Sequence, residues 1–336
     1  MTRNHLLDNA KYILILLVVF GHMIEPLIDT HPIIKVIYLS IYSFHMPAFV
    51  VIAGMLSKAE LGLEQLTKLI SSIFIPFIVF TVLYEFLGLM VTGSLSGYTI
   101  NLQPYWILWF LYSLFLWKIF LPIILNFKFP ILIAFIIAVA AGYAESIGYY
   151  LGLSRTLYFF PFFILGYKLT PKYLSQLKIK FNSNFYIVMF IGVLLLNLAF
   201  FSFFHEMQHQ WLYGSYSYSR LESEGMDGPL KRTALYLVSL VTVMTVLLLI
   251  PDKKIQLLSK GGGNSLYVYV WHGFFVKIFV GTGIVYVIGS FSEILSLVLL
   301  FVISAVLMLV LSSNFIMKFS QRFIMKPIHN LLLKQS

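Results

Sequence analysis

Two ionisable residues interrupt an apolar stretch near the start of the chain. In "YILILLVVFGHMIEP", which runs from Tyr12 to Pro26, His22 is followed three residues later by Glu25. Residues three apart lie on the same face of a helix. A carboxylate in that position orients an imidazole and raises its basicity, and histidine titrates near neutral pH. The spacing therefore predicts a general base with an orienting carboxylate.

Three further polar residues stand in apolar segments: His45 in "SFHMPAF", His272 in "YVYVWHGFF" and Arg155 in "LSRTLYFFPFF". Each histidine is either functional or a neutral side chain bonded to a neighbouring helix. Arg155 is either an interfacial anchor or a fixed cation for an anionic group. His22, Glu25 and His45 together could form a two-histidine, one-carboxylate metal set. No HExxH-type spacing supports that reading, so we expect no metal.

The composition identifies the environment of these residues. Hydrophobic residues make up 60% of the chain, charged residues 11%, and the mean hydropathy is +0.91, whereas soluble domains carry roughly 25% charged residues. The chain is therefore predicted to be an integral membrane protein. It contains no cysteine, which excludes disulfides and cysteine-ligated metals. We attribute the net charge of +10 to cationic cytoplasmic loops and expect no nucleic-acid partner.

The apolar segments predict an all-α bundle of about ten transmembrane helices in a single domain spanning residues 1–336. Most of the 23 Lys and Arg residues fall in inner segments when both termini are placed in the cytoplasm. A polar loop near 205–231 is then extracytoplasmic. The predicted spans are 10–28, 34–56, 66–91, 105–126, 130–149, 153–169, 184–205, 232–250, 264–288 and 291–316.

The helical rise places the first two histidines at a similar depth. At 1.5 Å per residue, His22 lies about 16 Å from Lys11 near the inner surface. His45 lies about 16 Å from the outer start of the second span by the same rise. Both are therefore expected near the middle of a bilayer core about 30 Å thick. Ionisable groups at that depth usually face the bundle interior or a water-filled cavity.

A glycine-rich segment precedes the ninth predicted span. "SKGGGNSLYVY", from Ser259 to Tyr269, is interpreted as a loop in which Asn264 and Ser265 provide the N-cap of the following helix. Backbone amides in such a loop bind phosphate, or the segment is a plain connection.

Several segments together resemble the membrane acyltransferase-3 family, and in particular its fucose-4-O-acetylase-like branch. They are "DNAKYILILLVVFGH", with a basic residue eleven positions before His22, and "SFHMPAFVVIAGM", supported by "LWFLYSLF", "SRTLYFFPFFILGYKL" and "GGNSLYVYVWHGFF". The resemblance covers nearly the whole chain. Many family members carry an Arg-x-x-Arg motif in the third span. This chain has none, so the roles of those arginines do not transfer to it.

The resemblance implies O-acylation of a cell-surface carbohydrate in the bacterial cytoplasmic membrane. Acetyl-CoA would be the donor from the cytoplasm, and the acceptor a hydroxyl of an extracytoplasmic or lipid-linked sugar. His22 would act as base, oriented by Glu25. His45 or Arg155 would donate to the oxyanion of the tetrahedral intermediate. Basic residues on the cytoplasmic side would bind the CoA phosphates, or would only reflect the topology: Lys11, Lys58, Lys168, Lys253 and Lys254.

The main alternative is a transporter or flippase for a sugar or a lipid-linked glycan, because such proteins also use polar groups near the midplane. A transporter would favour internal symmetry, and the sequence shows no convincing repeat. The oligomeric state does not follow from the sequence, because apolar helix faces do not distinguish lipid from a partner helix.

Overall fold

The computed structural model describes residues 4–179 and 183–332, and in this part of the chain it contains helices and no strand. Seven of the described helical segments are long and apolar enough to cross a membrane. The predicted all-α polytopic bundle is confirmed. The seven segments are His5–Leu27, Pro32–Met55, Leu63–Val91, Trp106–Ile124, Asn184–Phe203, Asp227–Leu249 and Glu293–Leu311.

The remaining three predicted spans are helical but shorter. They correspond to Pro130–Tyr143, to α9 (Leu153–Lys168), which contains Pro161, and to α14 (Ser265–Gly281). The ninth predicted span is interrupted at Gly283, where a positive φ of 79° separates α14 from α15 (Ile284–Gly289). The count of ten crossings therefore stays a prediction. So does the cytoplasmic placement of the termini, of which 1–3 and 333–336 lie outside the described residues.

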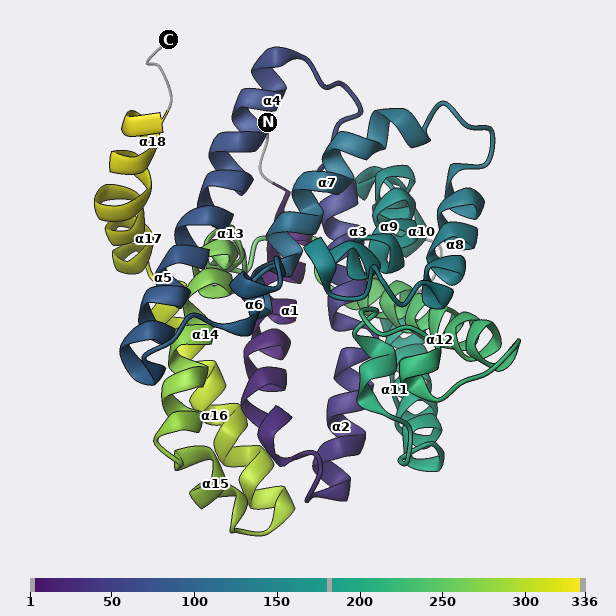
Figure 1. Cartoon of the computed structure of the whole chain (residues 1–336). Helices are drawn as coiled ribbons and strands as arrows, with labels where there is room; N and C mark the ends of the chain where they lie inside the picture. Colours follow the sequence, from purple (N-terminus) through teal and green to yellow (C-terminus); the bar gives the residue numbers. More distant parts are fainter. Residues whose placement is uncertain (1–3, 180–182, 333–336) are drawn as a thin grey trace. The chain divides into compact units, whose positions relative to one another are not determined.

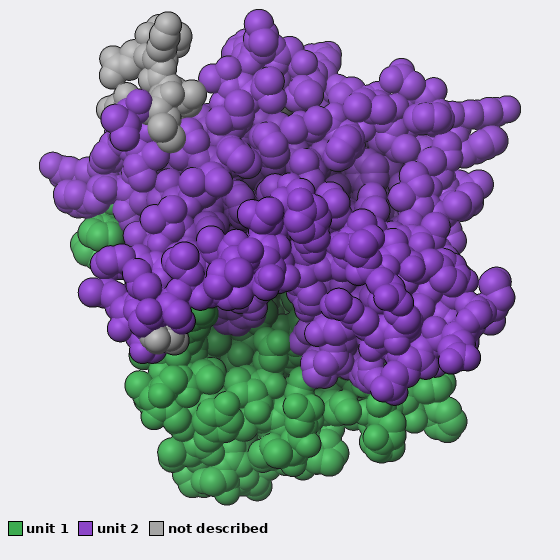
Figure 2. All heavy atoms as spheres, viewed as in Figure 1, with its two compact units in different colours: residues 1–49, 169–207, 235–320 green, residues 50–168, 208–234, 321–336 purple. Residues whose placement is uncertain are grey.

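The chain divides into two compact units, coloured separately in Figure 2. Unit 1 comprises residues 1–49, 169–207 and 235–320, and unit 2 comprises 50–168, 208–234 and 321–336. The single domain expected from the sequence stays a prediction. Unit 1 contains α1 (His5–Ile24), α2 (Pro32–Tyr42), the start of α3 (His45–Met55), α10 (Pro171–Ile179), α11 (Ser183–Phe203), most of α12 (Asp227–Leu249), α13 (Gln256–Gly263), α14, α15, α16 (Glu293–Leu311) and α17 (Asn314–Phe319).

Unit 2 contains the rest of α3 and the start of α12, together with the helices α4 (Leu63–Leu69), α5 (Ile75–Thr92), α6 (Gly97–Ile100), α7 (Trp109–Ile124), α8 (Pro130–Ala140), α9 and α18 (Lys326–Leu332).

The N-terminal helix α1 packs against helices from the far end of the chain, α13, α14 and α16 (Figure 1). It begins earlier than predicted because Asn4 Oδ1 accepts a hydrogen bond from the backbone N–H of Leu7 at 3.2 Å. It ends at Ile24, before a short 3₁₀ turn, Glu25–Leu27, that contains Pro26. α1 therefore presents His22 in its last turn and Glu25 directly after it.

The glycine-rich segment is not the loop that the sequence predicts. Gly261 and Gly262 lie in α13, where a Cβ on Gly262 would stand 1.8 Å from the Asp8 carbonyl oxygen on α1. The glycines are therefore required for close packing of two helices. Asn264 makes no capping bond, and its amide instead donates to the Ser312 carbonyl at 2.8 Å.

The second predicted span breaks between α2 and α3, just before His45. Side chains from other helices of unit 1 bind the polar groups at this break. The Asn197 amide on α11 donates to Ser43 Oγ at 3.1 Å, and Ser239 Oγ on α12 donates to the Ser43 carbonyl at 2.5 Å. These bonds fix the start of α3 and hence the position of His45.

Unit 2 is built around close crossings of α9. A Cβ on Gly54 in α3 would lie 2.1 Å from the Phe163 carbonyl oxygen, and one on Gly166 would lie 2.0 Å from that of Val51. The two helices therefore pack backbone to backbone through small residues, as membrane helices commonly do. α9 also packs against α7 and α8.

Candidate active site

His22 and Glu25 lie together at the end of α1. His22 Nδ1 stands 3.0 Å from Glu25 Oε2, and the two side chains are 16% and 29% exposed. The i, i+3 spacing thus brings the imidazole and the carboxylate into contact, as the sequence predicts. The pair is sheltered but still reachable by a small polar group.

Tyr42 adds a hydroxyl to this pair. Its oxygen lies 3.2 Å from His22 Nδ1, and its ring stacks on Tyr38 with ring centroids 3.9 Å apart. A Cβ on Gly21 would stand 2.9 Å from Tyr42 Cε2, so the glycine allows the tyrosine to approach α1. Gly21 therefore leaves the space that Tyr42 needs to reach His22, the next residue along α1.

The contacts of His22 determine its tautomer. An ionised carboxylate only accepts hydrogen bonds, so the Nδ1 atom facing Glu25 carries the proton. The lone pair of the neutral ring then lies on Nε2. This is the arrangement that holds a catalytic imidazole in the form that accepts a proton.

His45 is 2% exposed and lies beside Tyr42, with ring centroids 4.6 Å apart. Its Nδ1 lies 2.8 Å from the Ile41 carbonyl oxygen, which only accepts, so Nδ1 is the protonated atom. Nε2 of the neutral ring is then an acceptor. Donation from Nε2 to an oxyanion would require the protonated ring, and the predicted role of His45 stays a prediction.

His272, which the sequence leaves as either functional or structural, lies against the predicted site. It is fully buried on α14, and its ring stacks on that of His22 with centroids 5.6 Å apart and planes 27° apart. Nδ1 faces the carbonyl oxygens of Val268 and Tyr269, and Nε2 has no hydrogen-bond partner among the described residues. The sequence indicates this histidine only by its place in the apolar segment "WHGFF". Only the packing of α14 on α1 places it against His22.

Arg155 lies in unit 2, whereas His22, Glu25 and His45 lie in unit 1. Its guanidinium faces three aromatic rings, with ring centroids 5.3 Å (Trp109), 5.1 Å (Tyr149) and 5.5 Å (Tyr213) from its Cζ. The predicted contribution of Arg155 to the same reaction stays a prediction.

The five basic residues predicted to bind CoA phosphates divide between the units. Lys58 and Lys168 are exposed in unit 2. In unit 1, Lys253 and Lys254 are exposed, and Lys11 pairs with Asp8 at 2.8 Å. The predicted role of all five stays a prediction.

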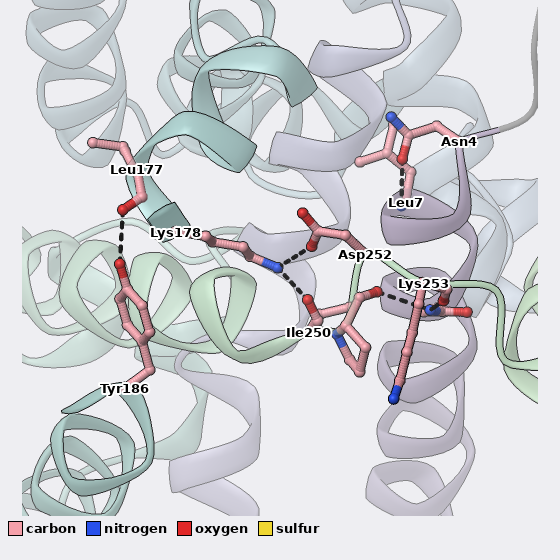
Figure 3. Close-up of polar contacts among 10 residues, drawn as sticks. Asn4, Leu7, Leu177, Lys178, Tyr186, Ile250, Asp252 and Lys253 are labelled. Carbon is pink, nitrogen blue, oxygen red and sulfur yellow. Dashed lines mark hydrogen bonds and ion pairs between the residues drawn. The ribbon is translucent and has the colours of Figure 1, made fainter. Parts of the chain in front are cut away.

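The segment that carries Lys253 and Lys254 is anchored on both sides (Figure 3). The Asn9 amide on α1 donates to the carbonyls of Pro251 and Lys253 at 2.9 and 3.0 Å, and Lys178 on α10 contacts the Ile250 carbonyl and Asp252. The backbone of Lys253 is therefore held at the end of α1 that also carries Lys11.

No group of three or more His, Cys, Asp or Glu side chains that could hold a metal ion occurs in residues 4–179 and 183–332. The polar groups around His22 comprise the Glu25 carboxylate, the Tyr42 hydroxyl and the imidazoles of His45 and His272. Such a set suits proton transfer to and from a reacting hydroxyl.

A family profile described as an acyltransferase domain matches residues 4–313, which is nearly the whole chain. No match was found among curated proteins or among solved structures. The match does not distinguish the fucose-4-O-acetylase-like branch from other branches. With a polytopic helical fold and a match of this extent, the chain belongs to the membrane acyltransferase-3 family and is a membrane acyltransferase.

Proposed function

We propose that the protein transfers an acetyl group from cytoplasmic acetyl-CoA to a hydroxyl of a cell-surface or lipid-linked sugar, with His22 as the general base. The observation that carries the proposal is the contact of His22 Nδ1 with Glu25 at 3.0 Å, which leaves the lone pair on Nε2. A sugar hydroxyl is a poor nucleophile until a base removes its proton. A neutral imidazole held in this tautomer is suited to that step.

In the proposed reaction the sugar oxygen attacks the thioester carbonyl while His22 Nε2 takes the hydroxyl proton. A C–O bond forms and the carbonyl π electrons move to oxygen, giving a tetrahedral intermediate. Collapse of this intermediate breaks the C–S bond, and the imidazolium returns the proton to the departing CoA sulfur. Glu25 stabilises the imidazolium in between, and the Tyr42 hydroxyl restrains the ring.

The cytoplasmic lysines are proposed to bind the phosphates of CoA. The strongest support comes from the place of three of these lysines. The hydrogen bonds of Asn9 hold the segment of Lys253 and Lys254 at the end of α1 that carries Lys11. We place the protein in a bacterial cytoplasmic membrane, where acetyl-CoA is available on one side and the glycan on the other. The family match gives no support to the transporter alternative.

The test is acetylation of a defined acceptor in vitro. Membrane vesicles containing the protein are supplied with acetyl-labelled acetyl-CoA and with surface polysaccharide purified from a strain that lacks the protein. We expect alkali-labile label in the polysaccharide, and mass spectrometry gives the number of acetyl groups per repeat. No label in the polysaccharide, in vesicles that contain normal amounts of protein, would contradict the proposed function.

The site is tested in the same assay with a matched pair of variants. His22→Ala should abolish transfer. His205→Ala should leave transfer unchanged. His205 is a matched control because it also contacts a glutamate, Glu206, at 2.9 Å, but its side chain is 53% exposed and lies in another part of the chain. Equal loss in both variants would show that the assay reports a general disturbance rather than the chemistry of His22.

A further inference from the structure

The Arg155 guanidinium has no negatively charged partner among the described residues. It makes no hydrogen bond and no ion pair with any residue in the described part of the chain, and its Nε is sealed from solvent without a partner. A buried N–H left without an acceptor destabilises the folded state. The chain thus keeps a guanidinium in place at a cost in stability.

The aromatic rings fix the guanidinium without using its hydrogen-bonding capacity. Trp109 comes from α7, Tyr149 precedes α9, and Tyr213 lies in the polar loop after α11. Cation–π attraction acts through the ring faces and the positive charge, whereas the five N–H donors of arginine lie in the plane of its fork. All three rings are partly exposed, so the cluster is accessible.

The nearby Tyr216 does not supply the missing negative charge. Burial and the neighbouring Tyr149 raise the pKa of Tyr216 to about 12, so its phenol is neutral at physiological pH. Asp and Glu side chains are excluded as well, since Arg155 has no ion pair among the described residues.

Arg232, in the same unit, shows what a structural arginine looks like here. It is 1% exposed, and it donates from Nη1 to the Ala138 carbonyl at 2.9 Å and from Nη2 to the Tyr216 carbonyl at 3.1 Å. Its Nε lacks a partner among the described residues, as that of Arg155 does, but its two Nη atoms join elements of the fold. Arg155 has comparable aromatic neighbours but no such bonds, so packing alone does not account for it.

We infer that Arg155, clamped by Trp109, Tyr149 and Tyr213, is a binding subsite for an anionic oxygen group, a carboxylate or a phosphate, on the acceptor. The planar fork of arginine matches such groups through paired N–H···O bonds. The identity of the ligand as part of the acceptor glycan rests on the proposed function. The subsite selects acidic acceptors, such as a sugar bearing a uronate or a phosphate, over neutral ones.

Binding is measured first, because it does not require transfer. The purified full-length protein in detergent is titrated with glucuronate, glucose 1-phosphate, inorganic phosphate and glucose, with tryptophan fluorescence as readout. We expect the anionic sugars to bind more tightly than glucose. Tight binding of glucuronate alone indicates that the ligand group is a carboxylate, and tight binding of glucose 1-phosphate alone indicates a phosphate. If inorganic phosphate binds as tightly as glucose 1-phosphate, the sugar contributes nothing to the affinity. Equal affinity for glucose and the anionic sugars would overturn the inference.

Three variants test whether the guanidinium of Arg155 is the group that binds the anionic sugar. Arg155→Gln should weaken anionic-sugar binding by about tenfold or more, the equivalent of one charge-assisted bond. Arg155→Lys keeps the charge without the fork and should fall in between. Arg220→Gln removes an exposed arginine of the loop that carries Tyr213 and should bind like the wild type. Unchanged binding in Arg155→Gln contradicts the inference. If Arg155→Gln does not fold, Arg155→Lys decides the same point.

A kinetic split separates this role from a catalytic one. With carboxylated polysaccharide as acceptor, Arg155→Gln should raise KM and leave kcat nearly unchanged. With the same polysaccharide after chemical reduction of its carboxyl groups, wild type and variant should be alike. An equal fall in kcat on both acceptors would instead assign Arg155 to the oxyanion. Absence of transfer by the wild type would contradict only the proposed function, since the binding titration stands independently.

Discussion

Replacing Glu25 by glutamine removes the negative charge opposite His22 while keeping an oxygen at nearly the same place. The charge matters most when His22 has taken the proton and become an imidazolium. A hydrogen bond between charged groups contributes about 1.5–3 kcal/mol. The 3.0 Å separation supports a value in this range, and the 29% exposure of Glu25 lets water screen part of it. A loss of that size slows transfer by about 10- to 150-fold.

The assay is the initial rate of acetyl transfer at saturating acetyl-CoA, divided by the amount of protein in the membrane. Glu206→Gln, in the exposed His205–Glu206 pair, is the matched control and should be as active as the wild type. Because Glu25→Gln acts on the transition state, kcat should fall while the KM for acetyl-CoA stays the same. A Glu25→Gln protein as fast as the wild type would refute the stabilisation of the His22 imidazolium by the carboxylate charge.

Four other changes test the surroundings of the site and the packing that supports it. Tyr42→Phe removes one neutral hydrogen bond and should lower the transfer rate by about 2- to 13-fold, and an unchanged rate would show that the hydroxyl does not restrain His22. Gly21→Ala pushes a Cβ to 2.9 Å from Tyr42, so it should reduce activity like Tyr42→Phe, at nearly normal protein levels. His272→Phe keeps a stacked ring and removes the unpartnered Nε2, so it should maintain thermal stability but lower the transfer rate. Normal transfer by this variant would exclude a role for that lone pair. Gly166→Val places a side chain against the Val51 carbonyl, which a bare Cβ would meet at 2.0 Å, and should lower the amount of folded protein. A normal melting temperature would contradict the backbone packing of α3 on α9.

The sequence predicts the main features of this structure because local signals carry them. Apolar runs and sparse charge indicate membrane helices, and the i, i+3 spacing puts Glu25, in the turn after α1, next to His22 in the last turn of that helix. Neither inference depends on how distant segments pack. The helix ends are less accurate. α1 begins at His5 through the Asn4 cap, and the second span breaks at Ser43, whose carbonyl accepts from a side chain of α12 and whose hydroxyl accepts from one of α11.

The features that the sequence does not predict depend on tertiary contacts. The sequence predicts that Gly262 is a loop residue, and only the close packing of α13 on the Asp8 carbonyl of α1 explains the glycine. His272 is one intramembrane histidine among several until α14 places its ring on that of His22. The three rings around Arg155 come from separate segments of the chain, so no local sequence pattern predicts that they meet.

The central claim is that His22 is the base that activates the acceptor hydroxyl. The most direct measurement is the rate of acetyl transfer to surface polysaccharide by purified His22→Ala, at a protein amount and melting temperature matched to the wild type. A general base contributes about 10²- to 10⁴-fold, so the rate should fall by at least the lower figure. A folded His22→Ala protein that transfers acetyl groups at the wild-type rate would contradict the claim.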